Sequence, residues 1–284
     1  MSQSFHCGRF VLDVSRPLIM GIVNVTDDSF SGDGLQGNAA AAIAQARRQI
    51  EEGAHLLDIG AESSRPGAAT VSAKLELERL LPVIRALRDC GLPLSVDTLK
   101  PEVMHAVLAE GVDMINDINA LRAPGAMQVA ANSNAAVCLM HMQGEPGTMQ
   151  HAPCYQDVVG EVAEFLGQRV AEAESAGIPL NRICVDPGFG FGKTLEHNLD
   201  LLRRLPELVV PGLPLLVGLS RKSMLGLLTG RVVTERVAGS LAAHVIAVQR
   251  GASIVRVHDV AATRDALAVV EAVYAADANE RGKG

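Results

Sequence analysis

The sequence is poor in aromatic residues and contains no tryptophan. Phe, Tyr and Trp together make up 3% of its 284 residues, too few for a platform on which the bases of a single strand stack. The net charge is −7 at pH 7, so the chain also lacks the basic surface that binds phosphate backbones. We therefore expect no nucleic-acid partner.

Long apolar runs and paired cysteines are lacking too. The longest apolar stretches, such as residues 209–219, are broken by Pro and Gly and fall short of the roughly 18 residues that a membrane helix needs. Residues 1–12 show no apolar run followed by a cleavage site, so we expect neither a signal peptide nor a membrane. The five cysteines are scattered without a CxxC pair, which argues against a disulfide framework and favours the cytoplasm.

Short apolar segments alternate with longer amphipathic ones along the whole chain. The expected strands are residues 18–23, 56–59, 94–96, 114–116, 136–140, 183–185, 215–218 and 254–257. The expected helices are residues 39–52, 73–89, 101–110, 124–131, 158–176, 197–205, 235–250 and 264–275. Eight such units predict an α/β fold, a (β/α)8 TIM barrel, as a single domain over 1–284 with short frayed tails near 1–4 and 277–284. An open doubly wound sheet with a small second domain is the alternative.

Polar residues follow all eight expected strands. In a barrel of this kind the catalytic groups lie at the C-terminal ends of the strands. The residues at the eight ends are Asn24, Asp58, Asp97, Asn116, His141, Asp186, Ser220 and Arg256. This pattern predicts a site in the mouth that these strand ends surround.

Asp97 and Asp186 belong to well-separated strands that point into the same mouth. They would form either a pair for acid–base chemistry or a pair of acceptors for a flat ligand rich in donors. Capping of the following helix is the simpler alternative for each of them. Asn116 adds a donor and an acceptor, and Lys222 adds donors only. Together they fit a heterocycle with an amino-amidine edge toward the carboxylates and a carbonyl toward the lysine.

An anion site is expected at the last two strand ends. Arg256 and His258 flank Val257, so both side chains point the same way and can face one anion. Ser220 and Arg221 add donors from the strand before, where barrels of this kind often bind phosphate. Because Mg²⁺ commonly binds one protein group plus waters and substrate phosphates, a single ligand would suffice beside such an anion.

Residues 188–194 read GFGFGKT but do not form a nucleotide-binding loop. A P-loop needs glycine where Pro187 stands, and the GxGxxG spacing is absent. We expect a mobile loop after Asp186, in which Phe191 covers a ligand. A second glycine-rich stretch, residues 26–37, is either a solvated loop or a lid.

From residue 18 to residue 260 the chain resembles the bacterial dihydropteroate synthases, a family of pterin-binding barrels. The matching segments, in order, are residues 20–26, 28–31, 58–60, 62–63, 65–67, 95–98, 116–118, 140–144, 186–193, 220–223 and 256–260. The resemblance implies a barrel that condenses a dihydropterin carrying a methyl diphosphate with 4-aminobenzoate. The products would be 7,8-dihydropteroate, for folate biosynthesis, and diphosphate. It also implies Mg²⁺, a homodimer and sensitivity to sulfonamides.

The resemblance assigns roles to individual residues. The pterin pocket would be formed by Asp97, Asn116, Asp186, Lys222, Met140, Phe191 and Arg256. The residues near 4-aminobenzoate would be Ser64, Arg65, Pro66, Phe30, Lys222 and Ser223. Diphosphate would meet Asn24, Arg256, His258 and Arg65, with Asn24 also on Mg²⁺. The residues implied for the chemistry are Lys222, Arg256, His258 and Asp97.

The chain departs from the family pattern at Asp27, Asp33, Ala61 and Ser64. Where the family has Thr, Ser64 keeps the hydroxyl but lacks the methyl group that would face the ring of 4-aminobenzoate. Asp27, where the family has Pro, adds a negative charge to a loop that the resemblance implies closes over diphosphate. Three alternatives remain: a pterin-barrel methyltransferase that passes a methyl group to a corrinoid, a pterin-binding paralogue without activity, and a Schiff-base aldolase that uses Lys222. The donors at residues 220–223 and 256–258 favour the synthase over the methyltransferase.

Overall fold

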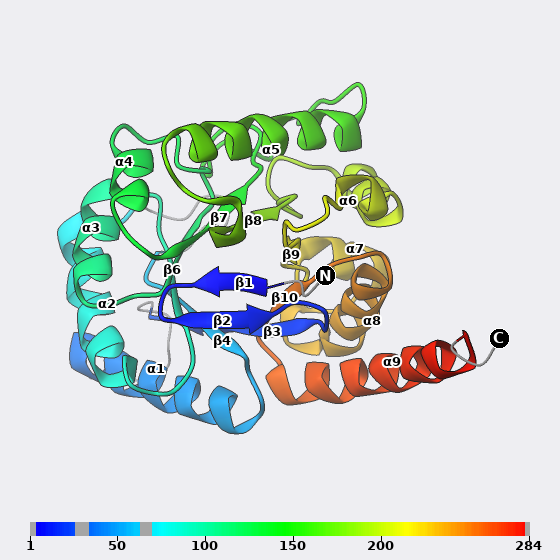
Figure 1. Ribbon diagram of the computed structural model, residues 1–284, viewed down its shortest axis with the longest axis horizontal. Coiled ribbons are helices and arrows are strands. Elements are labelled where there is room, and N and C mark those ends of the chain that lie inside the picture. Colours follow the sequence, from blue (N-terminus) through cyan, green and yellow to red (C-terminus); the bar gives the residue numbers. More distant parts are fainter. Residues whose placement is uncertain (1–3, 26–33, 63–69, 282–284) are drawn as a thin grey trace.

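Eight parallel strands form a barrel that helices surround (Figure 1). The computed structural model describes residues 4–25, 34–62 and 70–281. The barrel strands are β3 (Leu18–Asn24), β4 (Leu56–Gly60), β5 (Leu94–Asp97), β6 (Met114–Asp117), β7 (Ala136–Met140), β8 (Ile183–Asp186), β9 (Leu216–Val217) and β10 (Ile254–Val257). Their order is β8-β7-β6-β5-β4-β3-β10-β9, and a bridge between Val185 and Leu215 joins the two ends. The expected (β/α)8 barrel is confirmed.

The strands lie close to their predicted places because each is buried on both faces. Every residue of β4 and β7 is buried, as expected where helices cover the outside and side chains fill the inside. Cys138 pairs in register with Cys184, and both are buried core residues. The short strand β9 is two residues shorter than its predicted segment, residues 215–218.

The helices alternate with the strands, with one addition. They are α1 (Gly34–Glu51), α2 (Ala73–Leu87), α3 (Pro101–Ala109), α4 (Ala126–Ala131), α5 (Val158–Ser175), α6 (Leu195–Arg203), α7 (Ser223–Thr229), α8 (Val237–Gln249) and α9 (Val260–Arg281). Helix α7 was not predicted, because its seven residues are too few for a periodic pattern to stand out. No helix in the described ranges is long and apolar enough to cross a membrane.

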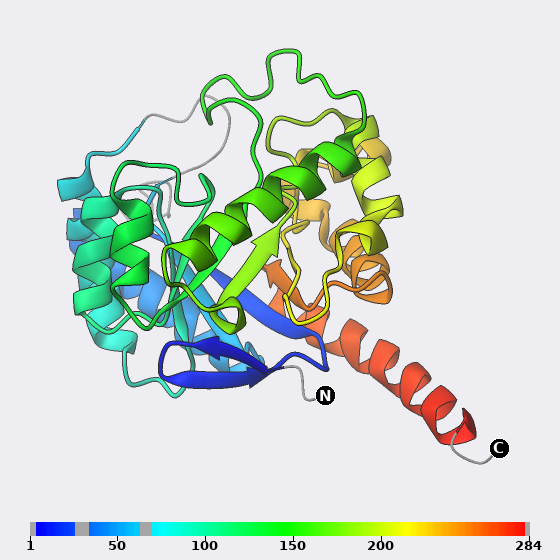
Figure 2. The same cartoon turned by 45° about the horizontal axis from the view of Figure 1, so that its top comes forward.

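A hairpin that was not predicted covers the N-terminal end of the barrel. It consists of β1 (Ser4–Cys7) and β2 (Phe10–Asp13), paired antiparallel (Figure 2). Phe5 and Cys7 are fully buried against the first residues of the barrel strands. Arg9 is held by Asp113, which precedes β6, at 2.8 Å between Nη2 and Oδ2. A ligand must therefore enter at the opposite, C-terminal end.

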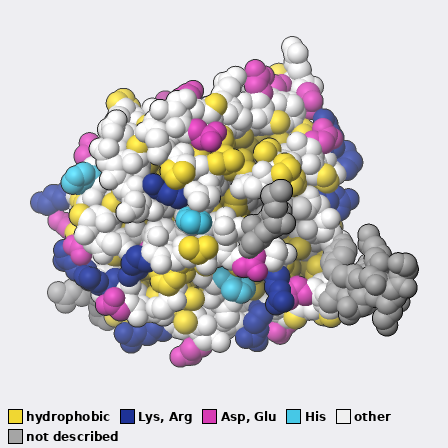
Figure 3. Space-filling view, in the orientation of Figure 1, with side chains coloured by type: hydrophobic (Ala, Val, Ile, Leu, Met, Phe, Trp, Pro, Cys, Tyr) yellow, Lys and Arg dark blue, Asp and Glu magenta, His cyan; other side chains and the backbone are white. Residues whose placement is uncertain are grey.

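The outer surface carries mixed charges, and one helix projects from it. On the face that carries the hairpin, positive and negative side chains are interspersed round the edge (Figure 3). Helix α9 extends beyond the barrel in both ribbon views (Figures 1 and 2). The neighbouring helices α7 and α8 pack beside one another, and α8 packs against α9.

Candidate active site

The predicted polar residues gather at the C-terminal mouth of the barrel. Asp97 and Asp186 are the last residues of β5 and β8, and Asn116 lies one residue before the end of β6. Lys222 stands at the start of α7, directly after the turn that follows β9. The topology brings these side chains together because parallel strands end at one edge of the sheet.

Arg256 connects three strands within the mouth. Its Nε donates to Oδ2 of Asp58 at 2.6 Å, and its Nη2 donates to Oδ2 of Asp97 at 2.9 Å. The same Asp58 oxygen accepts Nδ2 of Asn116 at 3.0 Å. Because the amide nitrogen of Asn116 faces Asp58, its oxygen is left as an acceptor for other groups. Asp58 thus holds two of the expected pterin residues, a role that was not predicted for it.

Burial raises the pKa of both mouth carboxylates, Asp97 and Asp186. It raises the pKa of Asp97 to about 7, against the pull of Arg256, and the charge of Asp58 raises that pKa further. Burial also raises the pKa of Asp186, whereas its hydrogen bond with the N–H of Gly188, at 2.7 Å, and the charge of Lys222 oppose this. Carboxylates whose pKa values are raised by burial, gathered at the mouth of a barrel, favour a site that binds or reacts.

Lys222 lies over an aromatic face. Its Nζ is 4.2 Å from the centroid of the Phe191 ring, a cation–π contact. Burial lowers the pKa of Lys222 to about 8, opposed by the charge of Asp186. Phe191 belongs to a small buried cluster at the mouth, separate from the main core, whose other members are Ile118, Met140, Met142 and Met149. This apolar cluster provides a wall for the face of a flat ring.

The residues after β9 and β10 pair with one another. Arg256 and His258 are partly exposed and Val257 between them is buried, which agrees with their predicted same-side alternation. Nδ1 of His258 lies 2.9 Å from the hydroxyl of Ser220, so one of the predicted anion donors supports the other.

Arg221 is not aimed at a free anion. Its guanidinium binds Asp259 through two contacts, 3.0 Å from Nε to Oδ2 and 2.5 Å from Nη2 to Oδ1. Its backbone is held in the left-handed region, at φ +57°, where its N–H binds Ser240 at 2.9 Å. Arg221 is expected from the sequence to add donors to the anion site, and in this structure Asp259 binds its Nε and Nη2.

The glycine-rich loop after Asp186 also differs from its prediction. It was expected to be mobile, yet most of residues 187–193 are buried. The amine of Lys193 is 3% exposed and points inward to Nδ1 of His141 at 2.9 Å, which agrees with the rejection of a P-loop. Gly188, Gly190 and Gly192 suggested a mobile loop, whereas the side chain that fixes the loop is that of Lys193, the next residue in the sequence.

Several predicted residues are exposed or lie outside the described ranges. Asn24 is exposed at the end of β3, and Ser223 is exposed at the first turn of α7. Phe30, Ser64, Arg65, Pro66 and the departures Asp27 and Asp33 lie outside the described residues. Ala61, the fourth departure, is buried, and its carbonyl accepts Nη1 of Arg79 at 3.0 Å. Within the described part of the chain, no group of three or more His, Cys, Asp or Glu could hold a metal ion.

Comparisons with known proteins show which family the chain is similar to. A family model described as pterin binding enzyme matches residues 20–258. The dihydropteroate synthase of Escherichia coli K12 is 50% identical over 271 residues, covering 95% of this chain and 96% of that protein. That of Neisseria meningitidis serogroup B is 52% identical over 276 residues, covering 95% and 97%.

Solved structures give the same result. The dihydropteroate synthase of Xanthomonas albilineans with 4-aminobenzoic acid superposes with a TM-score of 0.91 at 53% identity, covering 97% of this chain and 99% of that one. That of Burkholderia cenocepacia complexed with 7,8-dihydropteroate superposes with a TM-score of 0.90 at 50% identity, covering 97% and 98%.

Proposed function

Since the chain belongs to the pterin binding enzymes and, among them, to the dihydropteroate synthases, we propose that its mouth joins (7,8-dihydropterin-6-yl)methyl diphosphate to 4-aminobenzoate. The products are 7,8-dihydropteroate and diphosphate, which makes the protein a transferase of folate biosynthesis. The observation that carries this conclusion is the set of acceptors and one lysine around an apolar wall, at the mouth of a barrel of this family.

The pterin ring lies between the polar set and the apolar wall. The carboxylates of Asp97 and Asp186 and the oxygen of Asn116 accept hydrogen bonds from its amino-amidine edge and ring N–H groups. Lys222 donates to the ring from the other side, and Met140, Phe191 and Arg256 pack against its faces. Support comes from the hydrogen bond of Asn116 with Asp58, which leaves the Asn116 oxygen as the acceptor.

The diphosphate lies beside the end of β10. His258 and Arg256 neutralise its charge, and Arg65 is assigned to it from the sequence. Asn24 fits a Mg²⁺ ion, because it is exposed at the strand end and offers a hard amide oxygen, while waters and the diphosphate complete the shell. When bound, the ion supplies positive charge to the leaving group.

4-Aminobenzoate binds on the side of the mouth where β4 ends. Ser64, Arg65, Pro66, Phe30 and Ser223 are assigned to it from the sequence, together with Lys222. Only Lys222 and Ser223 belong to the described residues, and both stand at the start of α7.

The reaction exchanges one bond at the pterin methylene. The bond from the methylene carbon to the diphosphate oxygen breaks, that oxygen keeps the electron pair, and the aniline nitrogen bonds to the carbon and then loses a proton. Asp97 and Lys222 hold the ring, and the Asp97 carboxylate stabilises the positive charge that develops on it. Arg256 and His258 stabilise the negative charge on the departing diphosphate. The aniline nitrogen needs placement rather than activation.

The protein acts as a cytoplasmic homodimer in this proposal. A reducing compartment is supported by the five free cysteines, three of which are buried. A dimer is supported by apolar side chains that are exposed on or between α7, α8 and α9, namely Leu227, Leu228, Val232, Val233, Ile246, Val269 and Val273. Several exposed apolar residues on neighbouring helices are typical of an interface. Replacing Leu227, which is 70% exposed, by Glu should shift the mass measured by light scattering toward the monomer.

One assay tests the proposed activity. Diphosphate release from the pterin substrate is followed with and without 4-aminobenzoate, and the pteroate product is identified by mass spectrometry. We expect release to require 4-aminobenzoate and to match the product in a one-to-one ratio. Release without product, or binding of the pterin without any release, would overturn the proposal.

A further inference from the structure

The loop that follows β8 is pressed tightly against the end of β7. Its glycines Gly188, Gly190 and Gly192 all have positive φ, at +69°, +80° and +61°. A Cβ on Gly188 would lie 1.9 Å from the carbonyl oxygen of His141, and one on Gly192 would lie 2.5 Å from that of Gln143. No other residue type fits this approach, so the glycines allow close packing rather than motion.

Lys193 fixes this loop from the inside. Its Nζ lies 3.0 Å from the carbonyl oxygens of Gly188 and Phe191 and 2.9 Å from Nδ1 of His141. Burial lowers the pKa of Lys193 to about 7, against the charge of Asp186. In its ammonium form the group has three N–H donors and no acceptor, so these three partners satisfy it completely. Burial and the charge of Lys193 lower the pKa of His141 to about 3, so its ring is neutral and can accept at Nδ1.

The loop held by Lys193 carries two parts of the pterin pocket. Gly188 donates its N–H to Asp186, and the Phe191 ring lies under the amine of Lys222. The charge of Lys193 also opposes the rise in the pKa of Asp186, so it favours the ionised carboxylate. Lys193 itself lies 3% exposed behind this wall.

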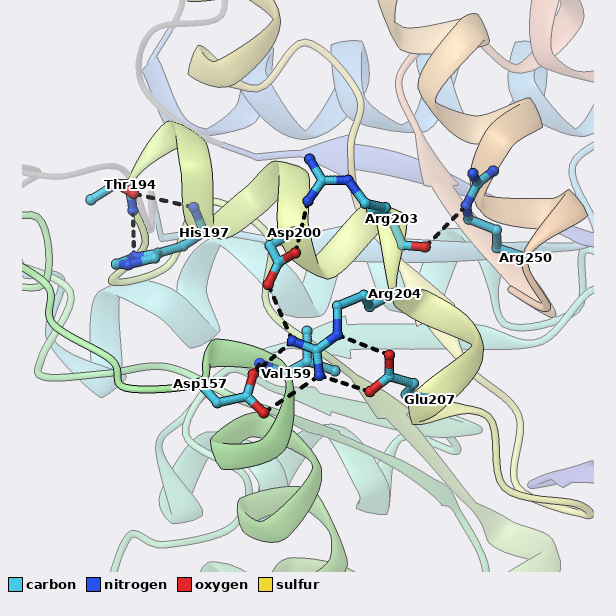
Figure 4. A network of polar contacts seen from close by, with 9 residues as sticks. All are labelled: Asp157, Val159, Thr194, His197, Asp200, Arg203, Arg204, Glu207 and Arg250. Carbon is cyan, nitrogen blue, oxygen red and sulfur yellow. Dashed lines mark hydrogen bonds and ion pairs between the residues drawn. The ribbon is translucent and has the colours of Figure 1, made fainter.

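The C-terminal end of the loop is anchored independently of Lys193. Thr194 caps α6 by accepting the N–H of His197, and the ring of His197 accepts the N–H of Thr194 in return (Figure 4). The hydroxyl of Tyr155 donates to the carbonyl of Gly192 at 2.8 Å. Loss of the Lys193 contacts should therefore loosen the middle of the loop without unfolding its C-terminal end.

We propose that Lys193 is a positioning residue for the pterin substrate, which together with His141 holds the wall formed by Phe191 and the backbone group that binds Asp186. This inference rests on the proposed function, since it deepens the account of the same pocket. Lys193 acts through the loop and makes no contact with the reacting atoms.

A matched pair of substitutions at His141 tests the inference. His141→Asn keeps a polar group at the place of Nδ1, whereas His141→Leu removes it, and both lose the ring that packs edge-on against Phe165 at 5.0 Å. The Kd of 6-hydroxymethyl-7,8-dihydropterin is measured by calorimetry, with kcat and both KM values from steady-state assays. We expect His141→Leu to raise the Kd and the pterin KM about tenfold over His141→Asn, because an unsatisfied buried donor is costly. The KM for 4-aminobenzoate should change less than twofold.

Controls separate this role from general stability. His55 accepts the N–H of Ile19 at Nδ1, 2.9 Å away, at the opposite end of the barrel, so His55→Leu should lower the melting temperature without changing the pterin Kd. Lys193→Met should raise the pterin Kd at least as much as His141→Leu. Equal pterin Kd values for the two His141 variants, or an unchanged Kd in Lys193→Met, would overturn the inference. Failure of the unaltered protein to bind the pterin would overturn the proposed function instead.

Discussion

Arg256 and Asp97 form an ion pair across the mouth of the barrel, with 2.9 Å between Nη2 and Oδ2. They lie on β10 and β5, which β3 and β4 separate in the sheet. A pterin that donates hydrogen bonds to Asp97 must share this carboxylate with the guanidinium or displace it. Binding of the ring is thereby coupled to the position of the cation that we assign to the diphosphate.

The pKa of Asp97 predicts how activity depends on pH. Burial raises it to about 7, so lowering the pH through 7 protonates the carboxylate and removes the acceptor that the pterin needs. We expect kcat/KM for the pterin substrate to fall about tenfold per pH unit well below pH 7. The measurement is a steady-state pH profile from pH 5 to pH 9.

Asp97→Asn is the control for that profile. An amide does not titrate, so the variant should be weaker at pH 8 but should lose the steep acid limb. An acid limb of the same slope and midpoint in Asp97→Asn would assign the titration to another group.

The free energy of unfolding should depend on pH in the opposite direction to the activity. Because the folded pKa of Asp97 exceeds the unfolded value, its contribution to stability falls as the pH rises from about 4 to about 7.

Removal of Asp186 should weaken pterin binding more than it weakens the fold. Asp186→Ala deletes a charged acceptor, and such hydrogen bonds contribute roughly 1.5–3 kcal/mol, so the pterin Kd should rise roughly ten- to hundredfold. Calorimetry with the free pterin checks this. Asp186→Asn keeps one acceptor oxygen for the N–H of Gly188, so its pterin Kd should lie between those of the parent protein and Asp186→Ala. An unchanged pterin Kd in Asp186→Ala would show that Asp186 does not belong to the pocket.

Arg256→Lys should weaken substrate binding more than expected from a substitution that keeps the positive charge. Lysine has no planar fork, so it cannot reach Asp58 and Asp97 together as the guanidinium does. We expect the Kd of the pterin diphosphate to rise more than that of the free pterin, because Arg256 is assigned to both groups. Competition binding of the two ligands measures the difference, and equal losses would restrict Arg256 to the ring.

The sequence predicted the barrel because strands buried on both faces read as short apolar runs. It also predicted that Asp97, Asn116 and Asp186 converge, since parallel strands end at one edge. The hairpin of residues 4–13 was missed because its two strands have four residues each, too few for a clear alternation.

The roles that were missed depend on contacts between distant parts of the chain. Asp58 acts through Asn116 and Arg256, which are 58 and 198 positions away, so no local pattern marks its role. Lys193 stands in a run that resembles a phosphate loop, and only the fold shows that its amine binds His141, 52 positions earlier. Arg221 was assigned to the anion site because it follows the strand before β10, and no local pattern shows that it pairs with Asp259, 38 positions later.

Asp113 should matter for stability and not for substrate binding. At the N-terminal end of the barrel its carboxylate accepts three hydrogen bonds from Arg9 and one from the N–H of Leu94, at 2.8–3.1 Å, and it is 1% exposed. Asp113→Ala leaves the Leu94 donor unsatisfied and removes the contacts between Arg9 of the hairpin and the barrel. We expect a loss of roughly 2–4 kcal/mol in the free energy of unfolding, measured in urea, with the pterin Kd unchanged.

Two variants show how that stability is divided. Asp113→Asn keeps one acceptor oxygen, so its loss in the free energy of unfolding should be about half that of Asp113→Ala. Arg9→Met should lose less than Asp113→Ala, because the Arg9 side chain is 45% exposed and water replaces part of its contacts when the pair is broken. The assignment fails if Asp113→Ala is as stable as the parent protein. It also fails if the variant weakens pterin binding at a temperature where it is fully folded, since the hairpin and the mouth lie at opposite ends of the barrel.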